Sequence, residues 1–127
     1  MNDPVNRKAI LSTLWIFVMF NYLYADILMM IVSPAIYQRA AGVMTAGTVL
    51  GLSALMELLI AMPLLARVLP YRPNRWMNII AGVTGTGFVA VTLVGHPPPY
   101  YVFFASLEIV CTVFIVWYAW TWRASGS

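Results

Sequence analysis

The sequence predicts an all-α integral membrane protein, a four-helix bundle of up-down-up-down topology with both termini in the cytoplasm. The composition is the first reason, since 62% of the residues are hydrophobic and only 9% are charged. The second is four apolar stretches close to the roughly 20 residues that a transmembrane helix needs. These stretches are continuous rather than alternating, which argues against barrel strands. They fill most of the chain, so we expect one transmembrane domain over residues 1–127 and no separate soluble domain.

Proline and glycine mark the ends of the predicted helices. Ser33-Pro34 ends the first helix, and 34–43 is expected to form an outer loop. Pro70 and Pro73 bracket a basic inner turn, and the run from Gly95 to Pro99 forms a stiff outer turn. Such short connections place sequential helices antiparallel. The predicted helices cover about 11–32, 44–66, 76–95 and 100–122.

The basic residues indicate the orientation. Six lie on one predicted side, and only Arg39 lies on the other. By the positive-inside rule, the side with six is cytoplasmic, which predicts a bacterial inner-membrane protein with both termini inside. The net charge of +3 comes from these topology-determining basic residues, so it does not indicate a nucleic-acid partner. The expected partner is the lipid bilayer. The six are Arg7, Lys8, Arg67, Arg72, Arg75 and Arg123.

Small residues mark where helices can approach closely. Gly47 and Gly51 form a GxxxG spacing in the second stretch, and Gly82, Gly85 and Gly87 lie in the third. They are compatible with packing inside one bundle or with a homodimer face. Pro63 should bend the second helix, because it removes a backbone hydrogen bond one turn earlier.

Three of the four carboxylates lie inside predicted membrane helices, each as the only charged residue of its segment: Asp26, Glu57 and Glu108. An ionisable side chain at the bilayer centre costs roughly 3 kcal/mol on insertion scales. At about 1.5 Å of rise per residue, Asp26 and Glu108 lie about 12 Å below the outer ends of their helices and Glu57 about 18 Å. The three acids are therefore expected to converge in one cavity in the outer half of the bundle.

Helical spacing supplies the other candidate contacts of this cavity. Tyr22 shares a face with Asp26, Ser53 with Glu57, and Tyr101 and Thr112 with Glu108. Arg39 and His96, both in predicted outer loops, are candidates for the pocket mouth. An apolar wall with sparse polar groups is typical of ligand pockets. Burial and mutual repulsion disfavour the charged forms, so at least one acid is expected to carry a proton at neutral pH.

No motif indicates a metal or a cofactor. The single cysteine, Cys111, and the single histidine exclude multi-cysteine and bis-histidine sites within one chain, and no Glu-x-x-His pair is present. Core packing is the expected role of Cys111 and of the methionines.

Four functions are compatible with the acidic pocket. The leading hypothesis is binding of a lipophilic or cationic small molecule, or a lipid, by the three acids. The second is a proton-coupled transporter of a small molecule or cation, in which Glu57 alternates between proton and substrate. The third is an enzyme, either a membrane isomerase or a quinone-linked redox subunit, although no residue is assigned a catalytic role. The fourth is a structural or assembly partner whose acids serve as neutral hydrogen-bonding groups between helices.

The segment from Leu52 to Pro70 resembles the second-helix signature of DoxX-like small membrane proteins. In that group a small residue precedes Glu-Leu, and a leucine-rich stretch then ends in Leu-Pro and a basic turn. Gly51, Glu57, Leu58 and Pro70 fit this pattern. The resemblance implies a four-helix bundle, with roles in quinone-dependent sulfur oxidation or chaperone-like assembly in some members. The chain departs from the pattern by carrying Asp26 and by lacking a histidine after the third helix, unless His96 takes that place. The opening from Leu11 to Asn21 is typical of an uncharacterised subgroup.

Overall fold

The computed structural model describes residues 4–95 and 97–122, apart from the side chains of 4, 5 and 37. This part of the chain folds into five helices and contains no strand. Helices α1, α3, α4 and α5 are long and apolar enough to cross a membrane, which confirms the predicted all-α class and the four predicted helices of membrane-spanning length. The helices are α1 (Pro4–Val32), α2 (Pro34–Gly42), α3 (Ala46–Val68), α4 (Tyr71–Leu93) and α5 (Pro99–Trp120).

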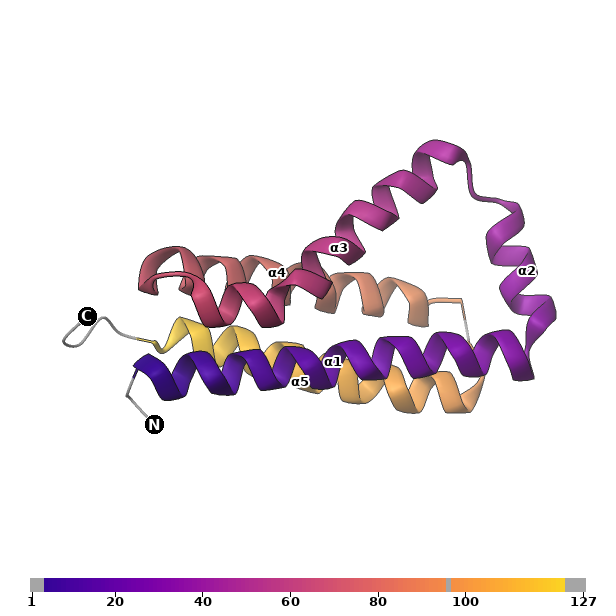
Figure 1. Cartoon of the computed structure of the whole chain (residues 1–127). Coiled ribbons are helices and arrows are strands. Elements are labelled where there is room, and N and C mark those ends of the chain that lie inside the picture. The colour runs from indigo at the N-terminus through magenta and orange to yellow at the C-terminus, as the bar shows by residue number, and fades with distance from the viewer. Residues whose placement is uncertain (1–3, 96, 123–127) are drawn as a thin grey trace.

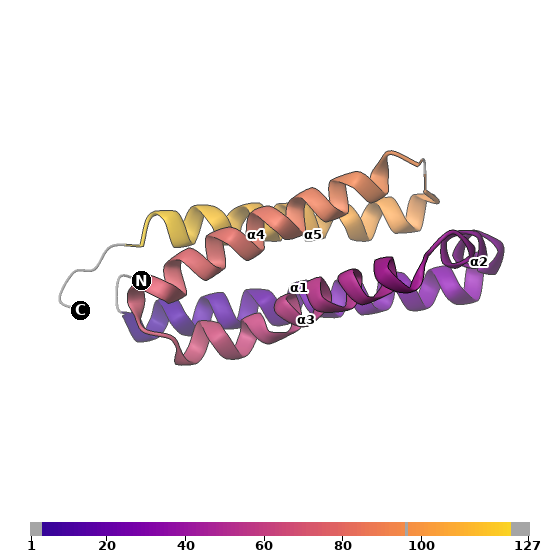
Figure 2. The same ribbon diagram turned by 90° about the horizontal axis from the view of Figure 1, so that it is seen from above.

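The four long helices run antiparallel to their neighbours in sequence, and both ends of the chain lie at the same end of the molecule (Figure 1). Seen from above, α1 and α3 form one layer and α4 and α5 the other (Figure 2). Helix α3 bends part-way along, so that its N-terminal half leads away from the bundle toward α2 (Figure 1). Pro63 accounts for this bend, as the sequence predicts, because it cannot donate to the carbonyl of Leu59.

The connection after α1 is a helix, and the predicted outer loop over 34–43 is wrong. Pro34 occupies the first helical turn, where its missing N–H is no loss and its fixed φ favours the helix. Alanine, glutamine and arginine, which are good helix formers, follow it. The Ser33 hydroxyl lies 2.8 Å from the Tyr100 hydroxyl and ties the joint between α1 and α2 to the start of α5.

Helix α4 begins at Tyr71, five residues before the predicted start, because Pro73 falls in its first turn, where no helical hydrogen bond is lost. The Asn74 side-chain amide donates to the carbonyls of Ala66 (2.7 Å) and Leu69 (3.1 Å) at the end of α3. These bonds satisfy two of the carbonyls that a helix end leaves without partners. The short basic turn between α3 and α4 is therefore stabilised by the buried Asn74 side chain.

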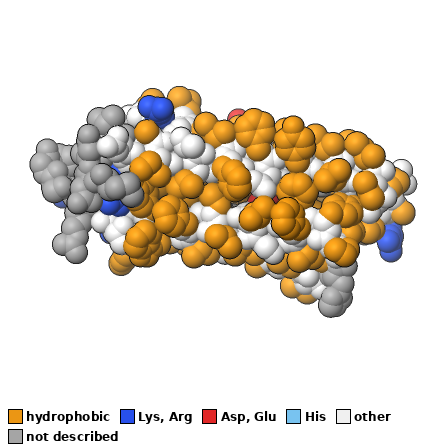
Figure 3. All heavy atoms as spheres, turned by 90° about the horizontal axis from the view of Figure 1, so that it is seen from below, with side chains coloured by type: hydrophobic (Ala, Val, Ile, Leu, Met, Phe, Trp, Pro, Cys, Tyr) orange, Lys and Arg blue, Asp and Glu red, His pale blue; other side chains and the backbone are white. Residues whose placement is uncertain are grey.

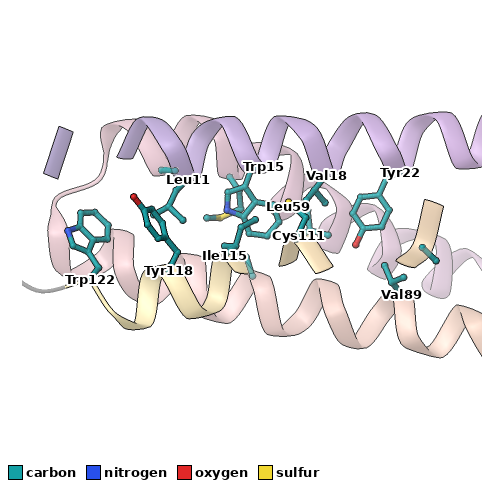
Figure 4. Packing of buried hydrophobic residues seen from close by; sticks show 14 residues of the cluster. Leu11, Trp15, Val18, Tyr22, Leu59, Val89, Cys111, Ile115, Tyr118 and Trp122 are labelled. Atoms are coloured by element: carbon teal, nitrogen blue, oxygen red, sulfur yellow. The ribbon is translucent and has the colours of Figure 1, made fainter. Parts of the chain in front are cut away.

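A hydrophobic core extends from the end with the termini past the middle of the bundle, as far as Val89 of α4 (Figure 4). Trp15, Leu59 and Ile115 are fully buried there and come from α1, α3 and α5. The Trp15 indole donates to Asn78 Oδ1 at 2.7 Å, and Asn78 donates to Asn74 Oδ1 at 2.7 Å. Buried polar groups stabilise a unique packing when all are satisfied. The sequence analysis did not identify this network.

Small residues allow α4 to approach α5 closely. A Cβ added at Gly82 would lie 2.5 Å from Val116 Cγ2, and the Thr86 and Thr112 hydroxyls are 2.6 Å apart. Packing inside the bundle is therefore the role of Gly82. Gly51 differs, since a Cβ there would meet no atom within 4 Å.

Two arginine side chains donate three hydrogen bonds to the carbonyls at the end of α5. Arg75 donates to Ala119 O at 3.1 Å and to Trp120 O at 2.9 Å, and Arg7 donates to Tyr118 O at 2.7 Å. Cations are favourable at a helix C-terminus because of the helix dipole. Blue basic side chains are visible toward the two ends of the molecule, and the surface between them is mostly hydrophobic (Figure 3). This distribution is the one expected of a chain embedded in lipid.

Candidate functional site

A cleft lies between the helices at the end of the molecule away from the termini. Its inner part has a volume of about 380 Å³ and is lined by residues of all five helices. A shallower hollow of about 560 Å³ adjoins it and shares Met29, Ala40, Thr92 and Tyr101 with it. The cleft exists because the N-terminal half of α3 diverges from the bundle (Figure 1). A volume in this range is typical of small-molecule sites.

The walls of the inner cleft are apolar, with a few polar side chains among them. Phe88 and three methionines, Met29, Met44 and Met56, form much of the wall. Methionine is flexible and polarisable, and it adapts to ligands of irregular shape. The polar side chains that line the cleft are Tyr22, Asp26, Thr92 and Tyr101.

Asp26 is the acid that opens into the cleft. It lies on α1, one helical turn after Tyr22, and its side chain is exposed because α3 no longer covers α1 at this level. Helical spacing of four residues places the Tyr22 and Asp26 side chains on the same face. The Tyr22 hydroxyl donates to the carbonyl of Gly85 at 3.4 Å, which places the phenol against α4.

Glu108 lies behind Tyr22 and is almost completely buried, with 3% of its surface exposed. Its Oε1 atom has no hydrogen-bond partner among the described residues. Glu108 lies near Tyr22, Tyr101 and Asp26, so the four side chains form one cluster. An unsatisfied buried carboxyl oxygen is costly, and it marks a point where a ligand group or a proton would be stabilising.

Tyr101 closes the cluster from α5. It lines the cleft together with Thr92 of α4, whose hydroxyl donates to Val89 O at 2.6 Å. Thr92 is a site residue that the sequence analysis missed. It is the only hydroxyl residue in the last two turns of α4, and that position was the available indication.

Glu57 does not join the other two acids. Met56 lines the cleft, and Glu57, one residue later, is turned by about 100° around the helix axis. Its side chain is exposed on the face of α3 opposite the buried Leu59 and Met62. The expected convergence of three acids in one cavity is therefore wrong. Asp26 lines the cleft and Glu108 is buried, whereas Glu57 faces away because the helical phase of α3 is set by its large apolar residues.

The remaining predicted contacts are distributed around the site. Ser53 is exposed beside Glu57 and donates to its own helix at Val49 O, 2.8 Å away. Thr112 is buried one turn below Glu108 and donates to the Glu108 carbonyl at 3.0 Å, so it supports the helix rather than lining the cleft. Arg39 lines the outer hollow, at the place predicted for the mouth. His96 lies outside the described residues.

Another surface hollow, of about 520 Å³, lies between α4 and α5. Val83, Val113 and Trp117 are among its lining residues, and no carboxylate is. An apolar groove between neighbouring membrane helices fits acyl chains of the bilayer. Among the described residues, no group of three or more His, Cys, Asp or Glu side chains is placed to hold a metal ion.

A family model matches residues 2–126 of the chain. The protein belongs to the family of unknown function DUF6326. No curated protein and no solved structure matches it. The similarity to DoxX-like proteins stays a prediction, and the site is therefore interpreted from its own geometry.

Proposed function

We propose that this DUF6326 protein binds a lipophilic cation, such as an amphiphile with a protonated amine, in the cleft between its helices. The observation that carries the proposal is the pairing of an accessible acid, Asp26, with a buried one, Glu108, whose Oε1 lacks a partner. A ligand ammonium group would donate to Asp26 and reduce the repulsion between the two carboxyls. The Tyr22 and Tyr101 rings beside them favour a cation as well.

The walls support a lipophilic body for this ligand. Leu52, Met56 and Phe88 contribute apolar surface, and we infer a lateral entrance to the cleft where the N-terminal half of α3 leaves the bundle. A ligand dissolved in the membrane could enter there without crossing a barrier of charged groups. Lipid molecules with a cationic headgroup meet the same requirements.

The orientation follows from the positive-inside rule. The basic residues of α1 and of the α3–α4 turn belong to the end with the termini, whereas Arg39 lines the hollow at the other end. We infer an up-down-up-down bundle in a bacterial inner membrane, with both termini in the cytoplasm and the cleft near the outer surface. The ligand would then be taken up from the outer leaflet.

Binding of radiolabelled tetraphenylphosphonium, a lipophilic cation, to the full chain in nanodiscs of uncharged lipid tests the proposal. We expect Asp26→Asn to weaken binding at least about tenfold, or about 1.4 kcal/mol. Glu57→Gln is the matched control, because it makes the same acid-to-amide change outside the cleft, and it should leave the affinity unchanged. Equal affinities of wild type and Asp26→Asn would refute the proposal.

The pH dependence of the same assay adds a second criterion. A carboxylate attracts a cation and a protonated carboxyl does not, so affinity should fall as the pH is lowered. Asp26→Asn should remove most of this dependence. Unchanged pH dependence in that variant would assign the titrating group elsewhere.

Proton-coupled transport of a cation is a second candidate, favoured by two intramembrane carboxyls of different burial, since Asp26 is exposed and Glu108 is 3% exposed. In this case Asp26 and Glu108, rather than Glu57, would exchange a proton for the substrate. Uptake of the same cation into proteoliposomes under a pH gradient separates transport from binding. Transport that persists in Asp26→Asn and disappears in Glu57→Gln would contradict this assignment.

A further inference from the structure

The outward face of α3 carries a seam with heptad spacing. Six residues follow one another at intervals of three and four, and a row of small side chains alternates with a row of larger ones. This is the a/d pattern by which two helices pack in a left-handed coiled coil. The seam residues are Gly47, Leu50, Ala54, Glu57, Ala61 and Leu64.

Five of the six seam residues are exposed, and Ala61 is partly buried. Leu50 is 72% exposed and Leu64 is 64% exposed, whereas Leu59 and Met62 on the opposite face of α3 are fully buried. At Gly47, an added Cβ would meet only the Thr45 side chain of its own segment within 4 Å. Within the described part of the bundle, α3 packs through the opposite face, which carries Leu59 and Met62.

Glu57 lies near the centre of the seam, where lipid would otherwise surround it. A carboxyl facing lipid in the middle of a membrane helix is unfavourable, and such groups normally face protein or water. The residues next to it in the seam, Ala54 and Ala61, are small enough for a second backbone to approach closely. A single polar residue within an apolar seam also defines the register of the pair.

We propose that two copies of this chain dimerise in parallel through the α3 seam and that Glu57 pairs with Glu57 of the second copy. Copies inserted in the same orientation are related by a two-fold axis along the membrane normal, so identical residues meet at the same depth. One proton shared between the two carboxyls supplies both a donor and an acceptor. This self-complementarity favours a second copy over an unrelated partner. The proposal is independent of the cleft, which lies on another side of α3.

Cysteine cross-linking of the full chain in lipid vesicles tests the contact. Under mild oxidation, Leu50→Cys should form disulfide-linked dimers in most molecules. Val110→Cys on the exposed face of α5 is the matched control and should form no disulfide-linked dimer, and wild type shows whether the buried Cys111 reacts. Equal cross-linking of Leu50→Cys and Val110→Cys would overturn the proposal.

Energy transfer between labelled copies, measured against dilution in lipid, gives the strength of the dimer. Ala54→Leu should weaken association about tenfold or more, because a larger side chain in the row of small residues keeps the two helices apart. Ala90→Leu on the exposed side of α4 is the control and should leave association unchanged. Glu57→Gln should retain the dimer, since an amide both donates and accepts, and Glu57→Ala should weaken it about tenfold. Wild type that stays monomeric at high protein density would show that another molecule or lipid covers the seam and would end the proposal.

Discussion

The end of the bundle that carries the termini and the end that carries the cleft differ in how they satisfy their polar groups. At the first end, Asn74, Asn78 and Trp15 are buried and fully hydrogen-bonded, and Arg75 and Arg7 donate to carbonyls of α5. The indole N–H of Trp122 is a polar group at this end that is buried without a hydrogen-bond partner among the described residues. At the second end, α3 leaves the bundle, Asp26 opens into a cleft, and Glu108 has an oxygen without a partner. Buried amides thus stabilise the first end of the bundle. The acids at the second end are available to bind a ligand.

Disrupting the hydrogen bonds of the buried asparagine side chains should cause the largest loss of stability. Asn78→Leu leaves the Trp15 N–H and one Asn74 oxygen without their partners, so we expect a loss of about 3 kcal/mol in unfolding free energy. Asp26→Asn in the open end should change it by less than about 0.5 kcal/mol. Denaturant unfolding in detergent, followed by circular dichroism, measures both. Similar losses of unfolding free energy in Asn78→Leu and Asp26→Asn would show that the two ends do not differ in stability.

The close α4–α5 contact is the next most sensitive point. Gly82→Ala places a methyl group against Val116 and should cost about 2 kcal/mol. Gly87→Ala makes the same change where nothing lies within 4 Å and should be close to neutral. The difference in unfolding free energy between the two variants is the quantity to measure. A neutral Gly82→Ala would mean that α4 and α5 are less tightly packed than described.

Filling the cleft should affect binding without affecting the fold. Leu52→Trp occupies part of the inner cleft and should weaken tetraphenylphosphonium binding about tenfold, or about 1.4 kcal/mol. Ile80→Trp, on the exposed side of α4, is the control of equal size and should bind as wild type does. Circular dichroism should be unchanged in both. Full affinity in Leu52→Trp would place the ligand elsewhere.

The caps of α5 should give the smallest effect. Arg75→Gln removes charged hydrogen bonds to Ala119 O and Trp120 O, and we expect a loss of about 0.5–1 kcal/mol. Arg72→Gln on the exposed surface of the same turn should be neutral. Thermal unfolding of the two variants side by side resolves the difference. Equal stability would show that the carbonyls of α5 are satisfied by other groups.

The sequence predicts the four long helices well, because hydrophobic length and proline positions act locally. It does not predict α2, since proline both ends α1 and begins the next helix. The depth of the acids follows from the rise per residue, but their direction around each helix depends on which apolar face packs. For α3 that face is the one with Leu59 and Met62, so Glu57 points away from Asp26. The Asn78–Trp15 bond joins residues 63 positions apart, and no local pattern indicates it.

Photolabelling tests most directly whether the acidic end binds a lipophilic cation. The wild-type protein in nanodiscs would be irradiated with a diazirine-bearing lipophilic amine, and the labelled peptides identified by mass spectrometry. Labelling in residues 22–29, 52–56 and 88–92 that is lost in Asp26→Asn is the predicted result. Labelling confined to the apolar groove between α4 and α5, around Val83, Val113 and Trp117, and unchanged in Asp26→Asn, would contradict it.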